Sequence, residues 1–219
     1  MRTDGGEMQQ LTTDPAPEWA PVWSPDQDTL AFYAFRTGNR EIFTMPSAGG
    51  AWTQITNDPA EDLGPTWSSD GKWIACFTGR NGGGILVSPA GGGPSHVLLP
   101  TRSATPKWSP KDDRLAFLER RGLSVVGADG SGLRMIVKGT VRGVPAWLPD
   151  GKSLIYVAPG EADGVAMMVR DDGTAARPLT KLSGRRGAMG YVATDGQFLY
   201  FTWEEDIGDL WVMNVEGGQ

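Results

Sequence analysis

The apolar residues of this chain come in short runs, separated by turns rich in glycine, proline and aspartate. Continuous apolarity over so short a length predicts strands buried on both faces, because a strand with one wet face alternates apolar and polar residues. Such runs occupy residues 30–35, 73–77, 115–118, 154–157 and 198–203. A second strand is expected after each, at residues 41–45, 84–87, 123–126, 165–169 and 209–213. No segment has a helical period of useful length, so the sequence predicts an all-β protein.

A tryptophan precedes each of the first four runs and opens a nearly constant phrase. These residues are Trp23, Trp67, Trp108 and Trp147, at intervals of 44, 41 and 39 residues. Each follows a proline by two residues and leads into a tight turn, whose side-chain acceptor is Asp26, Asp70, Asp150 or, in an eroded fifth copy, Asp195. A period of about 40–45 residues is typical of a β-propeller blade. The tryptophans are therefore predicted to pack between blades rather than to stack on a sugar.

Four antiparallel strands per repeat predict a single β-propeller domain over residues 1–219. The blades are expected at residues 13–56, 57–99, 100–137, 138–180 and 181–219, the last completed by residues 7–12. Residues 1–12 align without gaps with residues 45–56, which makes residues 7–12 an outer strand without a blade of its own. Docking of this strand on the fifth blade would close a five-bladed ring with no unpaired edge. A segment of a six- or seven-bladed parent would have the same ends, and the sequence leaves both readings open.

The first repeat resembles the repeat of TolB-like β-propellers, which are WD40-like propeller repeats. The matching residues are Leu11-Thr12, Trp23-Ser-Pro-Asp26, Leu30-Ala-Phe32, Arg36-Thr-Gly38, Glu41-Ile-Phe43, Met45 and Gly49-Gly50. The resemblance covers essentially the whole chain and implies a propeller, a bacterial periplasmic or otherwise extracytoplasmic setting, and protein partners such as envelope lipoproteins. It also implies that Arg36 and Glu41 brace their hairpin as an ion pair. Similar repeats occur in scaffold proteins, oligopeptidases and sensors, so the resemblance does not decide the function.

Composition and charge argue against several classes of partner and ligand. A net charge of -6 and a pI near 4.8 argue against nucleic acid or an anionic membrane surface as the main partner. No stretch approaches the roughly 18 apolar residues of a membrane span, and the first residues lack the apolar core of a signal peptide. Cys76 lies in an apolar run and is predicted to be buried. One cysteine and one histidine cannot assemble a zinc site of several such ligands, and neither a metal nor a cofactor is expected.

The irregular residues just before each repeat tryptophan are the candidates for binding. Loops there run inward from an outer strand to the next blade and should line one mouth of the central channel. We predict a partner-binding rim with acids in the first two blades, arginines in the last three and an aromatic anchor; it consists of Glu18, Trp19, Glu61, Asp62, Arg102, Arg142, Arg185 and Arg186. Such a rim suits a peptide or a zwitterionic partner. The alternative is that these are solvated loop charges that pair with one another.

The sequence contains no recognisable catalytic constellation. A Gly-x-Ser-x-Gly nucleophile elbow is absent, and the single histidine, His96, is expected to be exposed before an outer strand. The acidic run at residues 204–206 is expected to be a solvated turn. The leading hypothesis is a non-catalytic propeller that binds a protein or peptide at a channel face, monomeric if the ring closes. The alternatives are the substrate-gating propeller of a serine oligopeptidase or a sensor whose other domain is absent here, and, less favoured, a propeller glycosidase or lyase.

Overall fold

The computed structural model describes residues 9–100, 104–159, 164–179, 188–204 and 209–214. Over these residues the protein is all-β, as the apolar pattern predicts, and its one helical element is a 3-10 turn at Arg80–Gly82. Within the same residues there is no helix long and apolar enough to cross a membrane.

The strands form antiparallel meanders, in which each strand pairs with the next along the chain. Four sheets have four strands each. The first sheet contains β1 (Glu18–Trp23), β2 (Thr29–Phe35), β3 (Arg40–Pro46) and β4 (Thr53–Gln54), and the second contains β5 (Asp62–Trp67), β6 (Trp73–Thr78), β7 (Gly84–Pro89) and β8 (His96–Leu99). The third contains β9 (Ala104–Trp108), β10 (Arg114–Glu119), β11 (Gly122–Gly127) and β12 (Arg134–Lys138), and the fourth contains β13 (Arg142–Trp147), β14 (Ser153–Ala158), β15 (Val165–Arg170) and β16 (Arg177–Pro178). The fifth sheet contains β17 (Ala188–Thr194), β18 (Phe198–Glu204) and β19 (Asp209–Asn214).

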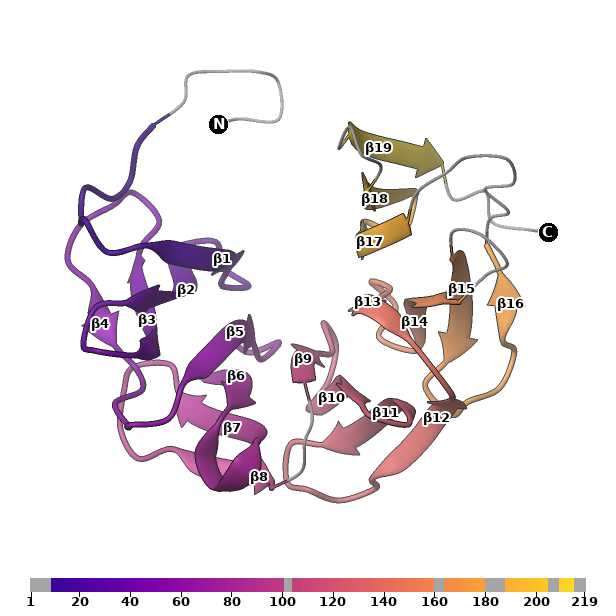
Figure 1. Ribbon diagram of the computed structural model, residues 1–219, viewed down its shortest axis with the longest axis horizontal. Coiled ribbons are helices and arrows are strands. Elements are labelled where there is room, and N and C mark those ends of the chain that lie inside the picture. Colours follow the sequence, from indigo (N-terminus) through magenta and orange to yellow (C-terminus); the bar gives the residue numbers. More distant parts are fainter. Residues whose placement is uncertain (1–8, 101–103, 160–163, 180–187, 205–208, 215–219) are drawn as a thin grey trace.

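The sheets are the blades of a β-propeller (Figure 1). They follow one another around an arc, with the first strand of each sheet on the inner side and the fourth at the periphery. The four-stranded antiparallel blade predicted from the repeat is therefore confirmed. The arc is open between the sheet β1–β4 and the sheet β17–β19, so this arrangement does not show the predicted closure of the ring.

The hydrophobic core lies between neighbouring blades. Alternate residues of one apolar run face opposite neighbours: Leu30 and Phe32 pack on one side of the first blade, and Ala31 packs with Ile74 and Cys76 of the second. This double burial explains why the runs are continuously apolar. The Cys76 thiol is buried as predicted, and burial raises its pKa.

The repeat tryptophans join successive blades. Trp108 and Trp147 are 6% and 8% exposed. The indole Nε1 of Trp147 donates a hydrogen bond of 2.9 Å to the backbone oxygen of Lys107 in the preceding blade, and Trp67 donates one of 3.2 Å to Val22. Trp23 is the exception, at 56% exposed, because no blade among the described residues covers its side of the first blade.

The turn aspartates act as the repeat predicts. Asp26 accepts hydrogen bonds from the Ser24 hydroxyl at 2.5 Å and from the backbone N–H of Asp28 at 3.1 Å, and these bonds lower the pKa of its carboxyl. Asp70 makes the equivalent bonds, and Asp150 and Asp195 accept from backbone N–H groups two and three residues on. Each carboxylate satisfies donors that the turn would otherwise leave unpaired.

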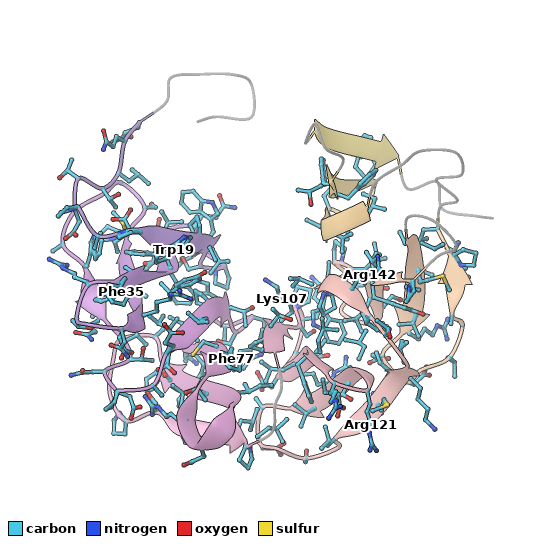
Figure 2. The ribbon with its side chains drawn as sticks, in the orientation of Figure 1. Trp19, Phe35, Phe77, Lys107, Arg121 and Arg142 are labelled. Carbon is cyan, nitrogen blue, oxygen red and sulfur yellow. The ribbon has the colours of Figure 1, made fainter. Side chains whose placement is uncertain are left out.

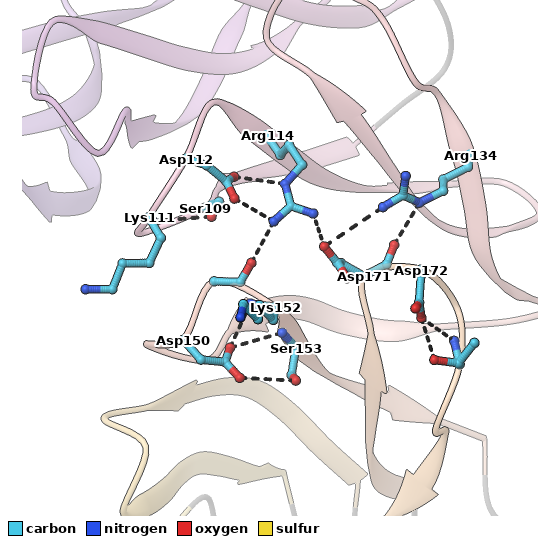
Figure 3. A network of polar contacts seen from close by, with 12 residues as sticks. Ser109, Lys111, Asp112, Arg114, Arg134, Asp150, Lys152, Ser153, Asp171 and Asp172 are labelled. Carbon is cyan, nitrogen blue, oxygen red and sulfur yellow. Dashed lines mark hydrogen bonds and ion pairs between the residues drawn. The ribbon is translucent and has the colours of Figure 1, made fainter.

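In the third blade Lys111 stands where the other turns have aspartate, and an arginine network joins this blade to the fourth (Figure 3). Arg114 donates to both oxygens of Asp112, at 3.0 and 2.5 Å, and to the backbone oxygen of Gly151 at 2.8 Å. It also pairs with Asp171, and its guanidinium lies 5.6 Å from the ring centroid of Trp147. The network thus bridges the two blades on the side of the repeat turns.

The chain before the first blade packs on the face of that blade against which no other described blade lies. Leu11 lies against the cluster that contains Phe32 and Met45, just as Ile55 lies between the first and second blades. The described part of the predicted strand at residues 7–12, residues 9–12, forms no strand. The expected ion pair between Arg36 and Glu41 is wrong: Arg36 pairs with Asp14 at 3.3 Å.

Candidate functional site

The inner strands β1, β5, β9 and β13 are sheet edges that cannot easily pair with a further strand. Each contains a repeat proline, which lacks a backbone N–H, and each has a break in register next to it. In β1, for example, Trp19 pairs with Tyr33 but the next pair is Val22 with Ala31. The bulged backbone takes a positive φ at Ala20 (50°), Gly64 (62°), Thr105 (53°) and Gly143 (67°). Bulges of this kind are over-represented beside functional sites.

A cavity of about 390 Å³ lies where these inner strands converge. The described residues of its walls come from four blades; they are Ala20, Tyr33, Leu63, Gly64, Phe77, Thr105, Pro106, Lys107 and Val144. Lys107 lies near the middle of the arc, on its inner side (Figure 2). Apart from the repeat proline Pro106, the residues of this wall differ from those at the equivalent positions of the other repeats.

Lys107 is the charged residue of the cavity wall. It is half-buried, and burial lowers the pKa of its ammonium group because the charged form loses hydration. Its side chain has no hydrogen bond or ion pair within the described part of the chain. Sequence reasoning missed this residue, although a signal was present: the position before the repeat tryptophan is Val22, Thr66 or Ala146 in the other blades.

An aromatic platform adjoins the cavity. Trp19 stacks on Tyr33, a wall residue, with ring centroids 5.3 Å apart and planes at 20°. The Arg40 guanidinium lies 5.5 Å from the Trp19 ring centroid, and its Nε is 3.6 Å from Glu61 Oε1. Trp19 nevertheless remains 38% exposed. The structure therefore brings two predicted rim residues, Trp19 and Glu61, to the same place.

The predicted rim acids Asp62 and Glu18 are less accessible than expected. Asp62 is fully buried, and its Oδ2 lies 3.3 Å from Arg80 Nη2. Burial raises the pKa of Asp62, while hydrogen bonding to Thr78 and the charge of Arg80 oppose the rise. Glu18 is half-buried and accepts a 2.7 Å hydrogen bond from the Thr12 hydroxyl. Both carboxylates hold the loop that enters a blade, so they are poorly placed to meet a partner.

The arginines of the predicted rim are only partly placed. Arg142 begins β13 and is exposed on the inner side of the arc (Figure 2). Arg102, Arg185 and Arg186 lie outside the described residues. In the acidic run at 204–206, residues 205 and 206 also lie outside them.

Two further hollows lie between neighbouring blades. One hollow, of about 370 Å³, lies between the first two blades. The other, of about 580 Å³, forms a groove between the second and third blades. Both contain a turn aspartate (Asp26 or Asp70) and the tryptophan of the next blade (Trp67 or Trp108), so they arise from the stacking itself. His96, exposed as predicted, lines the larger one. Among the described residues no group of three or more His, Cys, Asp or Glu side chains is placed to hold a metal ion.

Comparisons with solved structures agree on the fold. A protein from Agrobacterium tumefaciens assigned as TolB superposes with a TM-score of 0.80 at 18% identity, over 97% of this chain and 82% of that one. TolB from Acinetobacter baumannii gives 0.65 at 21% identity, over 76% of this chain and 44% of that one. A puromycin-hydrolysing peptidase from Mycobacterium tuberculosis gives 0.73 at 16% identity, over 93% of this chain and 36% of that one.

Sequence comparison adds the family. Dipeptidyl-peptidase 5 from Porphyromonas endodontalis is 35% identical over 82 residues, which are 36% of this chain and only 12% of that protein. The family of TolB beta propeller domains, PD40, matches residues 2–190, most of the 219-residue chain. Together with the observed blades, this match shows that the chain belongs to the family of TolB beta-propeller domains.

Proposed function

We propose that this domain is a non-catalytic propeller that binds a protein or peptide partner at the inner face of its blades. The observation that carries the proposal is the central cavity with the exposed Trp19 platform beside it. Exposed tryptophans and arginines that surround an apolar hollow are typical of binding hot spots. The sequence's single histidine, His96, lies in the groove between the second and third blades, away from this cavity.

The test is selection of peptides from a random-sequence phage library, followed by fluorescence anisotropy with the purified domain. Replacement of Trp19 by alanine should weaken binding about tenfold or more, because it removes the exposed anchor. Trp73→Ala is the matched control, since Trp73 is 39% exposed against 38% for Trp19 but lines the groove between the second and third blades. Failure to enrich any peptide, or equal losses in both variants, would contradict the proposal.

A second candidate is the propeller domain of a peptidase whose catalytic domain lies elsewhere in the protein. It is favoured by the 35% identity over 82 residues with dipeptidyl-peptidase 5. The inner cavity would then face a substrate on its way to the other domain. A gene whose reading frame continues from residue 219 into an α/β-hydrolase region would support this candidate; a frame with no hydrolase region on either side would reject it.

We further propose that the uncovered face of the first blade receives the sheet β17–β19, completed by residues 7–12, so that a monomeric five-bladed ring closes. The exposure of Trp23 and the packing of Leu11 on the cluster of Phe32 and Met45 support this, because the equivalent residues Trp147 and Ile55 are buried between blades. A cysteine in place of Trp23 should then react slowly with a thiol reagent, as should one in place of Trp147. Rapid labelling at position 23 alone would reject closure.

A further inference from the structure

The chemistry of the cavity wall restricts what can bind there. Among the nine described residues of the wall, only Tyr33, Thr105 and Lys107 have polar side-chain groups, and none of the nine is acidic. The rest offer aliphatic or aromatic surface, chiefly Leu63, Phe77 and Val144. An occupant that is complementary to this wall has an apolar group and a single negative charge.

Lys107 is the reason to expect a negative charge on the bound group. The Lys107 ammonium group is half-buried and has no anionic partner among the residues that the structure describes, so the hydration it has lost is not replaced there by an ion pair. A carboxylate brought by a ligand would restore the lost interaction as a charge-assisted hydrogen bond, in a setting that water screens poorly. The cavity is therefore better suited to an anion than to a neutral or cationic group.

The edges of the inner strands β1, β5, β9 and β13 restrict how a peptide can bind. Pro21, Pro65, Pro106 and Pro145 remove backbone donors from these edges, and the adjacent bulges break their register. A peptide therefore cannot easily add as an extra strand to β1, β5, β9 or β13, which favours recognition through its side chains or its ends. The volume of about 390 Å³ is near the lower limit of ligand pockets, and it favours a chain end over a segment that has to pass through.

Building on the proposed peptide-binding function, we propose that the cavity captures the C-terminal carboxylate of a peptide whose last residue is apolar. Lys107 binds the carboxylate, and Leu63 and Phe77 contact the terminal side chain.

The strained backbone of Thr105 supports a binding role for the cavity, because it lowers the stability of the folded domain. Its φ of 53° is unusual for a β-branched residue, and its buried Oγ1 has no hydrogen bond to any described residue. Strain of this kind concentrates where a ligand is clamped. At the equivalent point of the second blade the residue is Gly64, which takes φ = 62° freely.

Isothermal titration calorimetry with acetyl-Ala-Ala-Phe as the free acid and as the amide tests the proposal. The domain should bind the acid at least ten times more tightly than the amide. Lys107→Met should reduce this preference to less than threefold, whereas Lys152→Met, the same change at an exposed turn lysine, should preserve it. Acetyl-Ala-Ala-Ala should bind several times more weakly than the phenylalanine peptide, because it leaves the apolar wall uncovered.

Each result has a distinct meaning. Equal binding of acid and amide by the unaltered domain would overturn the inference without any variant, and so would a preference that survives in Lys107→Met. Tight binding of acetyl-Ala-Glu-Phe-amide would assign the site to an internal acidic side chain and overturn the chain-end reading. In these cases peptide binding itself would stand. If neither these peptides nor any from the library bind, the proposed function fails together with this inference.

Discussion

At the residue scale, burial decides which charged groups of the inner face can act. Asp62 and Lys107 both lie on inner strands, yet Asp62 is enclosed with Arg80, whereas Lys107 has no partner among the described residues. The sequence identified Asp62 as a rim residue because of its distance from Trp67. It could not show that the side chain turns into the space between blades.

Asp62 should make stability depend on pH in a distinctive way. Burial raises its pKa in the folded protein above the ordinary value of 3.8, so the folded state holds the proton more tightly than the unfolded chain does. Wild type should therefore lose stability relative to Asp62→Asn as the pH rises from about 3.8 through the folded-state pKa. Urea unfolding of both proteins between pH 3 and 7 measures the difference.

Asp70→Asn is the control with the opposite sign. Hydrogen bonds from the Ser68 hydroxyl and the Lys72 backbone lower the pKa of Asp70, so wild type should gain stability relative to this variant as the pH rises towards 3.8. Parallel curves for the two variants would contradict the assignment of Asp62 as a destabilising buried carboxyl.

Thr105→Gly should stabilise the domain by about 1 kcal/mol. Relief of the unfavourable φ stabilises the folded state by about 1–3 kcal/mol. The greater conformational freedom of glycine stabilises the unfolded chain by about 0.5–1 kcal/mol, which offsets part of this gain. Ala20→Gly, at the equivalent position with φ = 50°, should gain less because alanine is not β-branched. Thermal unfolding compares the two, and a loss of stability in Thr105→Gly would show that the side chain contributes more by packing than the backbone loses by strain.

At the element scale, the sequence predicted what the repeat enforces. Apolar runs became strands, turn aspartates hold their hairpins, and the tryptophans join blades, since stacking imposes the same environment in every unit. Predictions that relied on single units fared worse. Arg36 pairs with Asp14 rather than Glu41, and Lys107 went unnoticed, because such contacts depend on which side chain of a neighbouring blade is within reach.

Arg114 should be a principal polar link between the third and fourth blades. Arg114→Met would leave Asp112 without its guanidinium partner and Asp171 with the longer 3.9 Å pair to Arg134, and it should lower the free energy of unfolding by about 1–3 kcal/mol (Figure 3). Lys72→Met removes a solvent-exposed pair with Asp70 and should change it by less than about 0.5 kcal/mol. Urea denaturation of both variants measures this contrast, and equal effects would show that the network adds nothing beyond a surface ion pair.

At the scale of the whole molecule, ring closure decides how the first and last blades are stabilised. In the open arc Leu30, Phe32 and Met45 are already buried, and Leu11 and Trp52 are the described residues packed against their cluster from outside it; Trp23 remains exposed. A large aromatic ring left exposed is costly in water, and a blade placed against the Trp23 ring would bury it as Trp108 and Trp147 are buried.

Ring closure can therefore be tested by comparing how much Trp23→Ala and Trp147→Ala lower the free energy of unfolding. Trp147 is buried between blades, and its truncation should destabilise the domain by about 3–5 kcal/mol. If β17–β19 closes on the first blade, Trp23→Ala should cost at least about 2 kcal/mol, although Trp23 is 56% exposed in the open arc. Trp73→Ala supplies the baseline for a tryptophan that is 39% exposed. A Trp23 cost no greater than that baseline, measured by urea unfolding at low protein concentration, would mean that the arc stays open and that the first blade needs another partner.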